Sequence, residues 1–245
     1  MVTFSKKDIG EIGEKIIVRT EEKDFFGKIL RNVISNSTAN TIHCGGIIEA
    51  SIEIIKKEVF SSENYAEAVR LFGTDKARRI LVRAAKYCWG ASGLKMTVYK
   101  LYDVKLTGKS CNSQSIKKQG IIMYSPEALK ERNRIIAEAI KAGRKNTFNG
   151  PDWKDYHEKT HGEHSLPQNV VRDRLLFTEN VSEEINECFS HPFVSILKTE
   201  NDKIRANGYE HKGNGAKERY HFEVVEANTW DEEWKRQEEK SKNGN

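Results

Sequence analysis

Residues 125–143, SPEALKERNRIIAEAIKAG, carry the clearest helix signals in the chain. Ser125 provides an N-cap side chain, Pro126 suits the first position of a helix, and Gly143 suits the position that follows the last turn. The apolar residues inside the stretch recur at helical spacing and share one face: Leu129, Ile136 and Ile140. This pattern predicts an amphipathic helix that packs one face against a core.

Three helices are expected upstream of this stretch, over 46–60, 63–72 and 75–88. Apolar side chains at steps of three and four residues predict the first of them. Ser62 and Thr74 are N-cap residues for the next two, and Gly73 ends the second helix. The N-terminal part of the chain is therefore expected to be mostly helical.

Strands are expected over 94–106, 121–124, 193–197 and 219–225. Residues 94–106 alternate with a period of two, which is typical of a half-buried strand. Short helices are expected over 168–177 and 182–189, and a capping box of Thr229 with Glu232 predicts a last helix that ends near 240. The fold class is α+β, with a mostly helical basic body, a short β-sheet and a smaller acidic α+β C-terminal part.

Composition excludes several classes of protein. Of the 245 residues, 37% are hydrophobic and 9% aromatic, which is too apolar for a disordered chain. No apolar run reaches eighteen residues, so we expect no membrane span, and the first residues do not resemble a secretory signal. The four cysteines form no CxxC pair, which favours reduced thiols in the cytoplasm or nucleus rather than a secreted protein.

Charge is distributed unevenly along the chain. Residues 1–150 hold 27 Lys and Arg against 16 Asp and Glu, a net charge of +11, whereas 151–245 hold 14 against 20, a net charge of −6. Residues 144–168 have almost no apolar periodicity and contain Gly150-Pro151, so we expect a loop or linker there. We therefore place a domain boundary between a basic body, 1–150, and an acidic part, 151–245, that bears six of the seven histidines.

Basic residues form a stripe on the helix expected over 75–88. Lys76, Arg79, Arg83 and Lys86 follow one another at helical spacing, and Arg78 lies at the flank. The opposite face is apolar, with Ala77, Ile80, Leu81, Ala84 and Cys88. Aligned cations repel one another, and a phosphate backbone would remove that cost. The five cations are candidate nucleic-acid contacts, and the alternative is that they pair with acidic residues of the same chain.

Histidines cluster directly after Pro151. His157-Glu158-Lys159-Thr160-His161 matches HExxH, in which two histidines on one helix bind zinc and the glutamate acts as a general base. The flanking residues are polar, which is unlike the apolar packing around a true motif of this kind. His157, His161 and His164 are candidate ligands for a divalent metal, and histidine with carboxylates suits Zn or Mn. A solvent-exposed polar loop is the alternative.

The order of His161, His164, Asn180 and His191 resembles that of a His-Asn-His nuclease finger. The resemblance implies a catalytic histidine on a strand, an asparagine on a loop and a metal-binding histidine on a helix. This stretch of about thirty residues lacks the Gly-Gly turn and the adjacent His-His pair of that family.

Three functions remain open from the sequence. The first is a non-catalytic protein that binds RNA or DNA through the basic helix. The second is a metal-dependent nuclease that uses the 157–164 segment. The third is a self-assembling structural protein, a homo-oligomer whose oppositely charged parts meet between copies.

Overall fold

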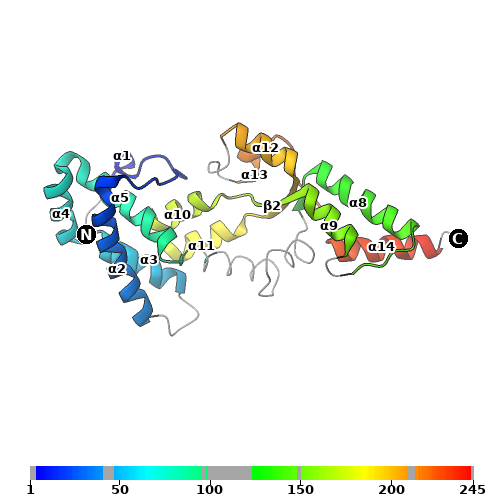
Figure 1. Cartoon of the computed structure of the whole chain (residues 1–245), viewed down its shortest axis with the longest axis horizontal. Coiled ribbons are helices and arrows are strands. Elements are labelled where there is room, and N and C mark those ends of the chain that lie inside the picture. Colours follow the sequence, from blue (N-terminus) through cyan, green and yellow to red (C-terminus); the bar gives the residue numbers. More distant parts are fainter. Residues whose placement is uncertain are drawn as a thin grey trace. The chain divides into compact units, whose positions relative to one another are not determined.

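The computed structural model describes residues 4–40, 47–94, 98, 123–147, 150–208, 213 and 215–243. The α+β class is confirmed, because helices predominate and one mixed sheet is present (Figure 1). The helices are α1 (Lys6–Ile9), the short 3-10 helix η1 (Thr20–Glu22), α2 (Lys23–Asn40), α3 (Ile47–Val59), α4 (Ser62–Phe72), α5 (Thr74–Ala91), α8 (Pro126–Lys141), α9 (Pro151–Lys159), α10 (Gln168–Phe177), α11 (Val181–Ser190), α12 (Lys198–Ala206), α13 (Ala216–Arg219) and α14 (Trp230–Asn243). The strands are β1 (Met123–Tyr124), β2 (Thr160–His164), β3 (Phe193–Leu197) and β4 (Val225–Glu226). None of the described helices is both long enough and apolar enough to cross a bilayer.

The chain divides into two compact units, each built from two separate stretches of sequence. The helical unit contains Met1–Leu101 and Gln168–Cys188, and the sheet unit contains Tyr102–Pro167 and Phe189–Asn245. This division does not coincide with the boundary expected at 150/151. The reason is that α10 packs on α5 and α3, which brings a segment of the expected acidic part into the helical unit.

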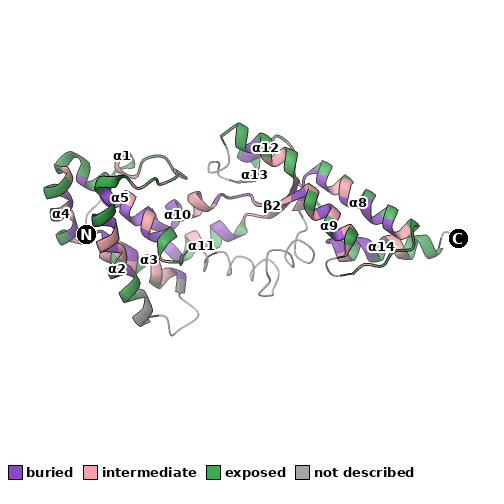
Figure 2. Ribbon diagram, in the orientation of Figure 1, coloured by how far each residue is buried: buried purple, intermediate pink, exposed green. Residues whose placement is uncertain are grey.

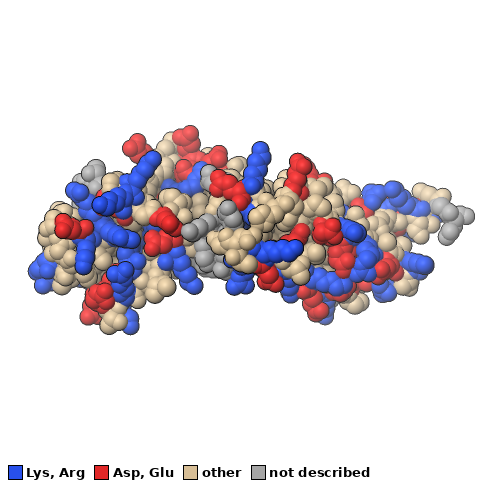
Figure 3. All heavy atoms as spheres, turned by 90° about the horizontal axis from the view of Figure 1, so that it is seen from above, with Lys and Arg blue, Asp and Glu red and all other residues tan. Residues whose placement is uncertain are grey.

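The charge difference along the sequence is not a difference between these units. The helical unit holds 19 Lys and Arg against 17 Asp and Glu, a net charge of +2, and the sheet unit holds 22 against 19, a net charge of +3. On the face shown in Figure 3, Lys and Arg side chains are interspersed with Asp and Glu. The two compact units are therefore not oppositely charged.

Helix α5 is the central element of the helical unit. It packs against α1, α2, α3, α4 and α10, and the buried positions along it are visible in Figure 2. The expected apolar face is confirmed, since its five residues, Ala77 to Cys88, are buried. Gly73 joins α4 to α5 at a φ of 83°, which favours glycine, so a single residue makes the turn.

The sheet of the other unit has the strand order β2-β3-β1-β4. Strand β1 is parallel to β3, with Tyr124 opposite Ser195, and the other two pairs are antiparallel. Val194 and Ile196 pack on Ile204 of α12 on one face of the sheet. On the other face the hydroxyl groups of Ser195 and Tyr156 of α9 lie 2.8 Å apart. Side chains alternate across a strand, so α9 and α12 cover opposite faces.

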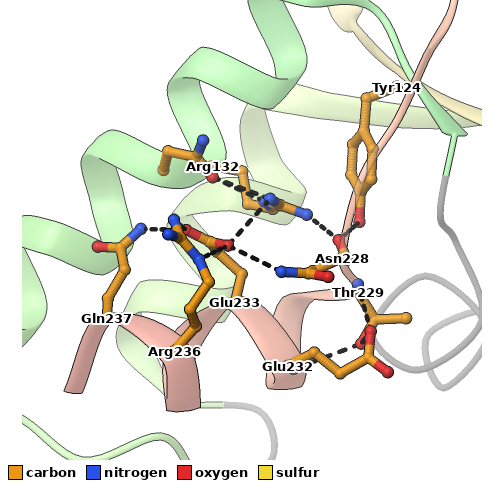
Figure 4. A network of polar contacts seen from close by, with 9 residues as sticks. Tyr124, Arg132, Asn228, Thr229, Glu232, Glu233, Arg236 and Gln237 are labelled. Carbon is orange, nitrogen blue, oxygen red and sulfur yellow. Dashed lines mark hydrogen bonds and ion pairs between the residues drawn. The ribbon is translucent and has the colours of Figure 1, made fainter. Parts of the chain in front are cut away.

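A polar network and a tryptophan cluster join α8 to α14. Arg132 of α8 is buried and lies 3.9 Å from the carboxylate of Glu233, which also accepts hydrogen bonds from Arg236 and Gln237 (Figure 4). The guanidinium of Arg132 donates to the Asn228 carbonyl. Aromatic rings complete the contact between these helices and α9: Trp153, Tyr156, Trp230 and Trp234.

The cap predictions at α8 and α14 are confirmed, whereas those at α4 and α5 are wrong. Ser61, not Ser62, caps α4, and Thr74 is the first residue of α5, after Gly73 at the N-cap position. The Ser125 hydroxyl accepts a hydrogen bond from the Ala128 amide, and Thr229 and Glu232 form the capping box at the start of α14. The loop expected over 144–168 is wrong in its second half, because α9 and β2 form there. Most of the strand expected over 94–106 lies outside the described residues, although Leu94 and Val98 are helical. The strand expected over 219–225 is reduced to β4, which starts at Val225.

Candidate functional site

Helix α5 exposes three of the five predicted cations in its first two turns. Lys76, Arg78 and Arg79 are exposed, and none of the three forms an ion pair with any residue that the structure describes. Hydrogen bonds from Ser5 hold the pKa of Asp8 below its ordinary value, with a smaller contribution from the charge of Arg78. The start of α5 therefore presents three cations to solvent.

Arg83, the next residue of the predicted stripe, is engaged within the chain. Its Nε atom lies 2.8 Å from Oε1 of Glu22, and its Nη2 atom lies 2.8 Å from Oε2. Nη2 also donates to the Ile17 carbonyl at 2.7 Å. The Arg83 side chain is 12% exposed and that of Glu22 is 1% exposed. Burial alone would raise the pKa of Glu22, but the hydrogen bonds from Arg83 and the Arg19 amide lower it.

Lys86 is fully buried, so its predicted place on an exposed stripe is wrong. Its ammonium lies 3.1 Å from Oδ2 of Asp173 and donates to the Ile9 carbonyl at 3.0 Å. Burial lowers the pKa of Lys86, an effect that the nearby Asp173 carboxylate partly opposes. Asp173 also accepts hydrogen bonds from Arg172 at 2.6 Å and from the Gly13 amide at 2.8 Å. This buried ion pair joins α5 to α10 and holds the N-terminal segment against both.

The sequence contains a signal for this pair, which helical spacing of the cations alone did not reveal. Asp173 lies between Val170 and Phe177 at steps of three and four, and Lys86 lies between Val82 and Trp89 at steps of four and three. Each charged residue thus interrupts an apolar stripe of its own helix. Charged residues are rarely buried unless they are paired, so two such interruptions of opposite sign favour one shared buried contact.

The histidine segment is divided between two elements. His157 lies on α9, its ring 6.3 Å from that of Trp153, whereas His161 and His164 lie on β2. The interpretation of HExxH as a helical zinc site is therefore wrong, because the helix ends at Lys159 before the second histidine. Residues three apart on a strand point to opposite faces, which also separates His161 from His164. In the described part of the chain, no three His, Cys, Asp or Glu side chains are grouped to hold a metal ion.

His161 instead lies beside an acid and an arginine. Its Nε2 is 3.1 Å from Oε2 of Glu163, and Arg219 of α13 pairs with the other oxygen of that carboxylate and donates to the His164 carbonyl. Burial would raise the pKa of Glu163, but His161 and Arg219 together lower it. The carboxylate thus cross-links β2 to α13.

The ring of His164 packs edge-on against Phe193 at 4.6 Å, and its Nε2 atom is shielded from solvent. Burial lowers the pKa of His164 to about 4, so this imidazole is neutral at pH 7.

Asn180, which the nuclease resemblance assigns to a loop, lies immediately before α11. Its Oδ1 accepts a hydrogen bond from the Glu183 amide at 3.1 Å, so the side chain is a helix cap. No observation on the described residues favours a nuclease site here.

Comparison with protein-family models, with curated proteins and with solved structures finds no match for this chain.

Proposed function

We propose that this protein binds nucleic acid without catalysing a reaction on it, and that Lys76, Arg78 and Arg79 contact the phosphate backbone. The observation that carries the proposal is the exposure of these three cations at the start of α5, with no ion pair to any described residue. RNA and DNA share the phosphate backbone that these cations would contact, so the proposal covers both.

Electrostatics support an anionic partner at this position. The N-terminal end of a helix carries a partial positive charge, so cations in the first turns are unfavourable and anions are favourable. The first turn of α5 contains one acid, Asp75, and three cations follow it within four residues. A bound phosphate would offset both the repulsion between the cations and their unfavourable position on the helix.

The proposed interface is smaller than the sequence predicts. Arg83 and Lys86 are held by Glu22 and Asp173, so they are left out of the contact set. Three phosphate contacts predict a slope of log affinity against log salt of roughly −2.7 for duplex DNA and roughly −2 for a single strand. Five contacts would give about −4.5 for duplex DNA.

The test is fluorescence anisotropy with labelled single-stranded RNA, single-stranded DNA and duplex DNA between 50 and 200 mM salt. The variant Lys76→Glu/Arg78→Glu/Arg79→Glu is expected to lose most of the affinity and most of the salt dependence. Acidic residues suit the start of a helix, so this variant is expected to fold, which circular dichroism checks. Lys15→Glu/Lys23→Glu/Lys57→Glu, which reverses three exposed lysines of the same unit, changes the net charge by the same amount. It is the matched control and is expected to bind as the wild type does. Equal affinity of the triple variant and the control would refute the proposal.

A further inference from the structure

A crevice opens at the carboxyl ends of β1 and β3 in the sheet unit. It has a volume of about 490 Å³ and is lined by residues 127–134 of α8, by the first turn of α12 and by the last turn of α9. Cavities of 300 to 1,000 Å³ are typical of small-molecule sites. The crevice is therefore large enough for a ligand of the size of a monosaccharide derivative.

The topology of the sheet explains why the crevice lies there. Strands β1 and β3 are adjacent and parallel, and each leads directly into a helix. Leu129 of α8 packs with Tyr124 on the face that α9 also covers, whereas Ile204 of α12 packs on the other face. The chain thus leaves two neighbouring parallel strands in opposite directions. In α/β sheets, such a point leaves a gap at the strand ends, which is where ligands bind.

Two lysines in the crevice are not held by close ion pairs. Lys198 is exposed, begins α12 and forms no ion pair with a described residue. The Lys130 side chain is 79% exposed, and Glu127, its ion-pair partner, is 4.0 Å away. The other two cations of the lining are neutralised, because Glu131 binds Arg134 at 2.7 Å and Lys159 at 3.0 Å.

The position of Lys198 is not explained by the stability of its helix. A lysine at the first position of a helix opposes the helix dipole, which favours an acid there. Lys130 on α8 and Lys198 on α12 both line the crevice, so an anionic group bound there is attracted by both charges. Glu158 of α9 also lines the crevice, and a carboxylate there accepts hydrogen bonds from hydroxyl groups.

We propose that this crevice binds a phosphorylated sugar, with Lys130 and Lys198 on the phosphate and Glu158 on a sugar hydroxyl. The site is separate from the cations of α5, which lie in the helical unit. It therefore does not depend on the nucleic-acid proposal. A sugar phosphate matches the lining because it carries both a phosphate dianion, which the lysines attract, and hydroxyl groups, which donate hydrogen bonds to the carboxylate.

The test is isothermal titration calorimetry of the full chain with ribose 5-phosphate, inorganic phosphate and ribose. Ribose 5-phosphate is expected to bind at least tenfold more tightly than inorganic phosphate, and ribose more weakly still. Lys130→Glu/Lys198→Glu is expected to weaken ribose 5-phosphate binding at least tenfold. Lys203→Glu, which changes an exposed lysine of α12 away from the crevice, is expected to leave it unchanged.

The outcomes separate this proposal from the nucleic-acid proposal. The triple variant of Lys76, Arg78 and Arg79 is expected to bind ribose 5-phosphate as the wild type does, and a loss of binding there would overturn the crevice as the site. Equal binding of ribose 5-phosphate and inorganic phosphate would overturn the sugar contact with Glu158. The proposal as a whole would be overturned if ribose 5-phosphate did not bind detectably. It would also be overturned if Lys130→Glu/Lys198→Glu and the control Lys203→Glu bound it equally well.

Discussion

Asp173 is predicted to be the most sensitive charged residue of the helical unit. Its carboxylate is fully buried and accepts hydrogen bonds from Arg172 and the Gly13 amide while it pairs with Lys86. Asp173→Asn leaves two buried cations without a carboxylate. Removal of one partner from a buried ion pair typically costs about 3–5 kcal/mol, which is a large fraction of the stability of a small domain.

Lys86→Met is expected to cost less, although it breaks the same ion pair. The Asp173 carboxylate keeps Arg172 and the Gly13 amide as partners, and methionine fills much of the volume of the lysine stem. The loss is then close to that of a hydrogen bond to a charged group, about 1.5–3 kcal/mol. Asp173→Asn is therefore expected to destabilise the protein more than Lys86→Met. The first substitution leaves two buried cations without a carboxylate, whereas the second leaves Asp173 with two hydrogen-bond donors.

The loss of unfolding free energy caused by Asp173→Asn is expected to become smaller as the pH rises from 7 toward 9.5. Burial already lowers the pKa of Lys86, and removal of the carboxylate lowers it further. The unfolded state then binds more protons than the folded state in this range, so stability increases with pH. The buried Lys86 ammonium can lose its proton, whereas a guanidinium cannot.

Hydrogen exchange with mass spectrometry measures this effect for each unit separately. A loss of 3–5 kcal/mol corresponds to exchange that is roughly 10²- to 10⁴-fold faster for the best-protected amides of α5 and α10. The amides of α8 and α14, in the sheet unit, serve as the internal control and are expected to be unchanged. Equal costs for the two substitutions, or a larger cost for Lys86→Met, would refute the role of Asp173 as the common acceptor.

Three further predictions concern pH, capping and thiol reactivity. The pKa of His164 falls from about 6.5 when unfolded to about 4 when folded, so stability is lost as the pH drops through this range, by up to about 3 kcal/mol. Urea unfolding at several pH values is expected to show that loss in the wild type and a smaller one in His164→Phe, and equal profiles would contradict it. Thr229→Ala removes the cap of α14 and is expected to cost about 1 kcal/mol, measured by hydrogen exchange of α14, with no change contradicting the capping box. Burial raises the thiol pKa of Cys88 and of Cys188 to about 12, so both should resist alkylation until urea unfolds the chain, and rapid labelling of the native protein would show that they are accessible.

Local rules predicted several of the helices because their signals lie within a few residues of one another, but they missed α2 and α12. The expected helix over 168–177 matches α10, and that over 182–189 lies within α11. The N-cap of Ser125 and the capping box of Thr229 with Glu232 are also confirmed. A cap depends on one side chain and an amide two or three residues away, so the local sequence limits the candidates to one or two residues. At α4 the cap is Ser61 rather than its neighbour Ser62.

The same rules failed where a segment depends on distant partners. Residues 151–164 lack apolar periodicity, yet α9 and β2 form there. Trp153 and Tyr156 are buried against Trp230, and β2 pairs with β3. The two short strands β1 and β4 likewise exist through pairing with each other, and β1 also pairs with β3. Strand pairing joins residues far apart in the sequence, and no local pattern encodes the partner.

The candidate interface shows the same division. The sequence by itself determined that Lys76, Arg79, Arg83 and Lys86 share a side of α5, because helical spacing fixes that relation. Only the tertiary structure decided that the second half of this row is covered, by Glu22 in one case and by Asp173 in the other. It also decided that the basic and acidic halves of the sequence mix in two units of similar charge. The physical reason is that helical periodicity acts over a few residues, whereas burial and ion pairing depend on which distant segments pack together.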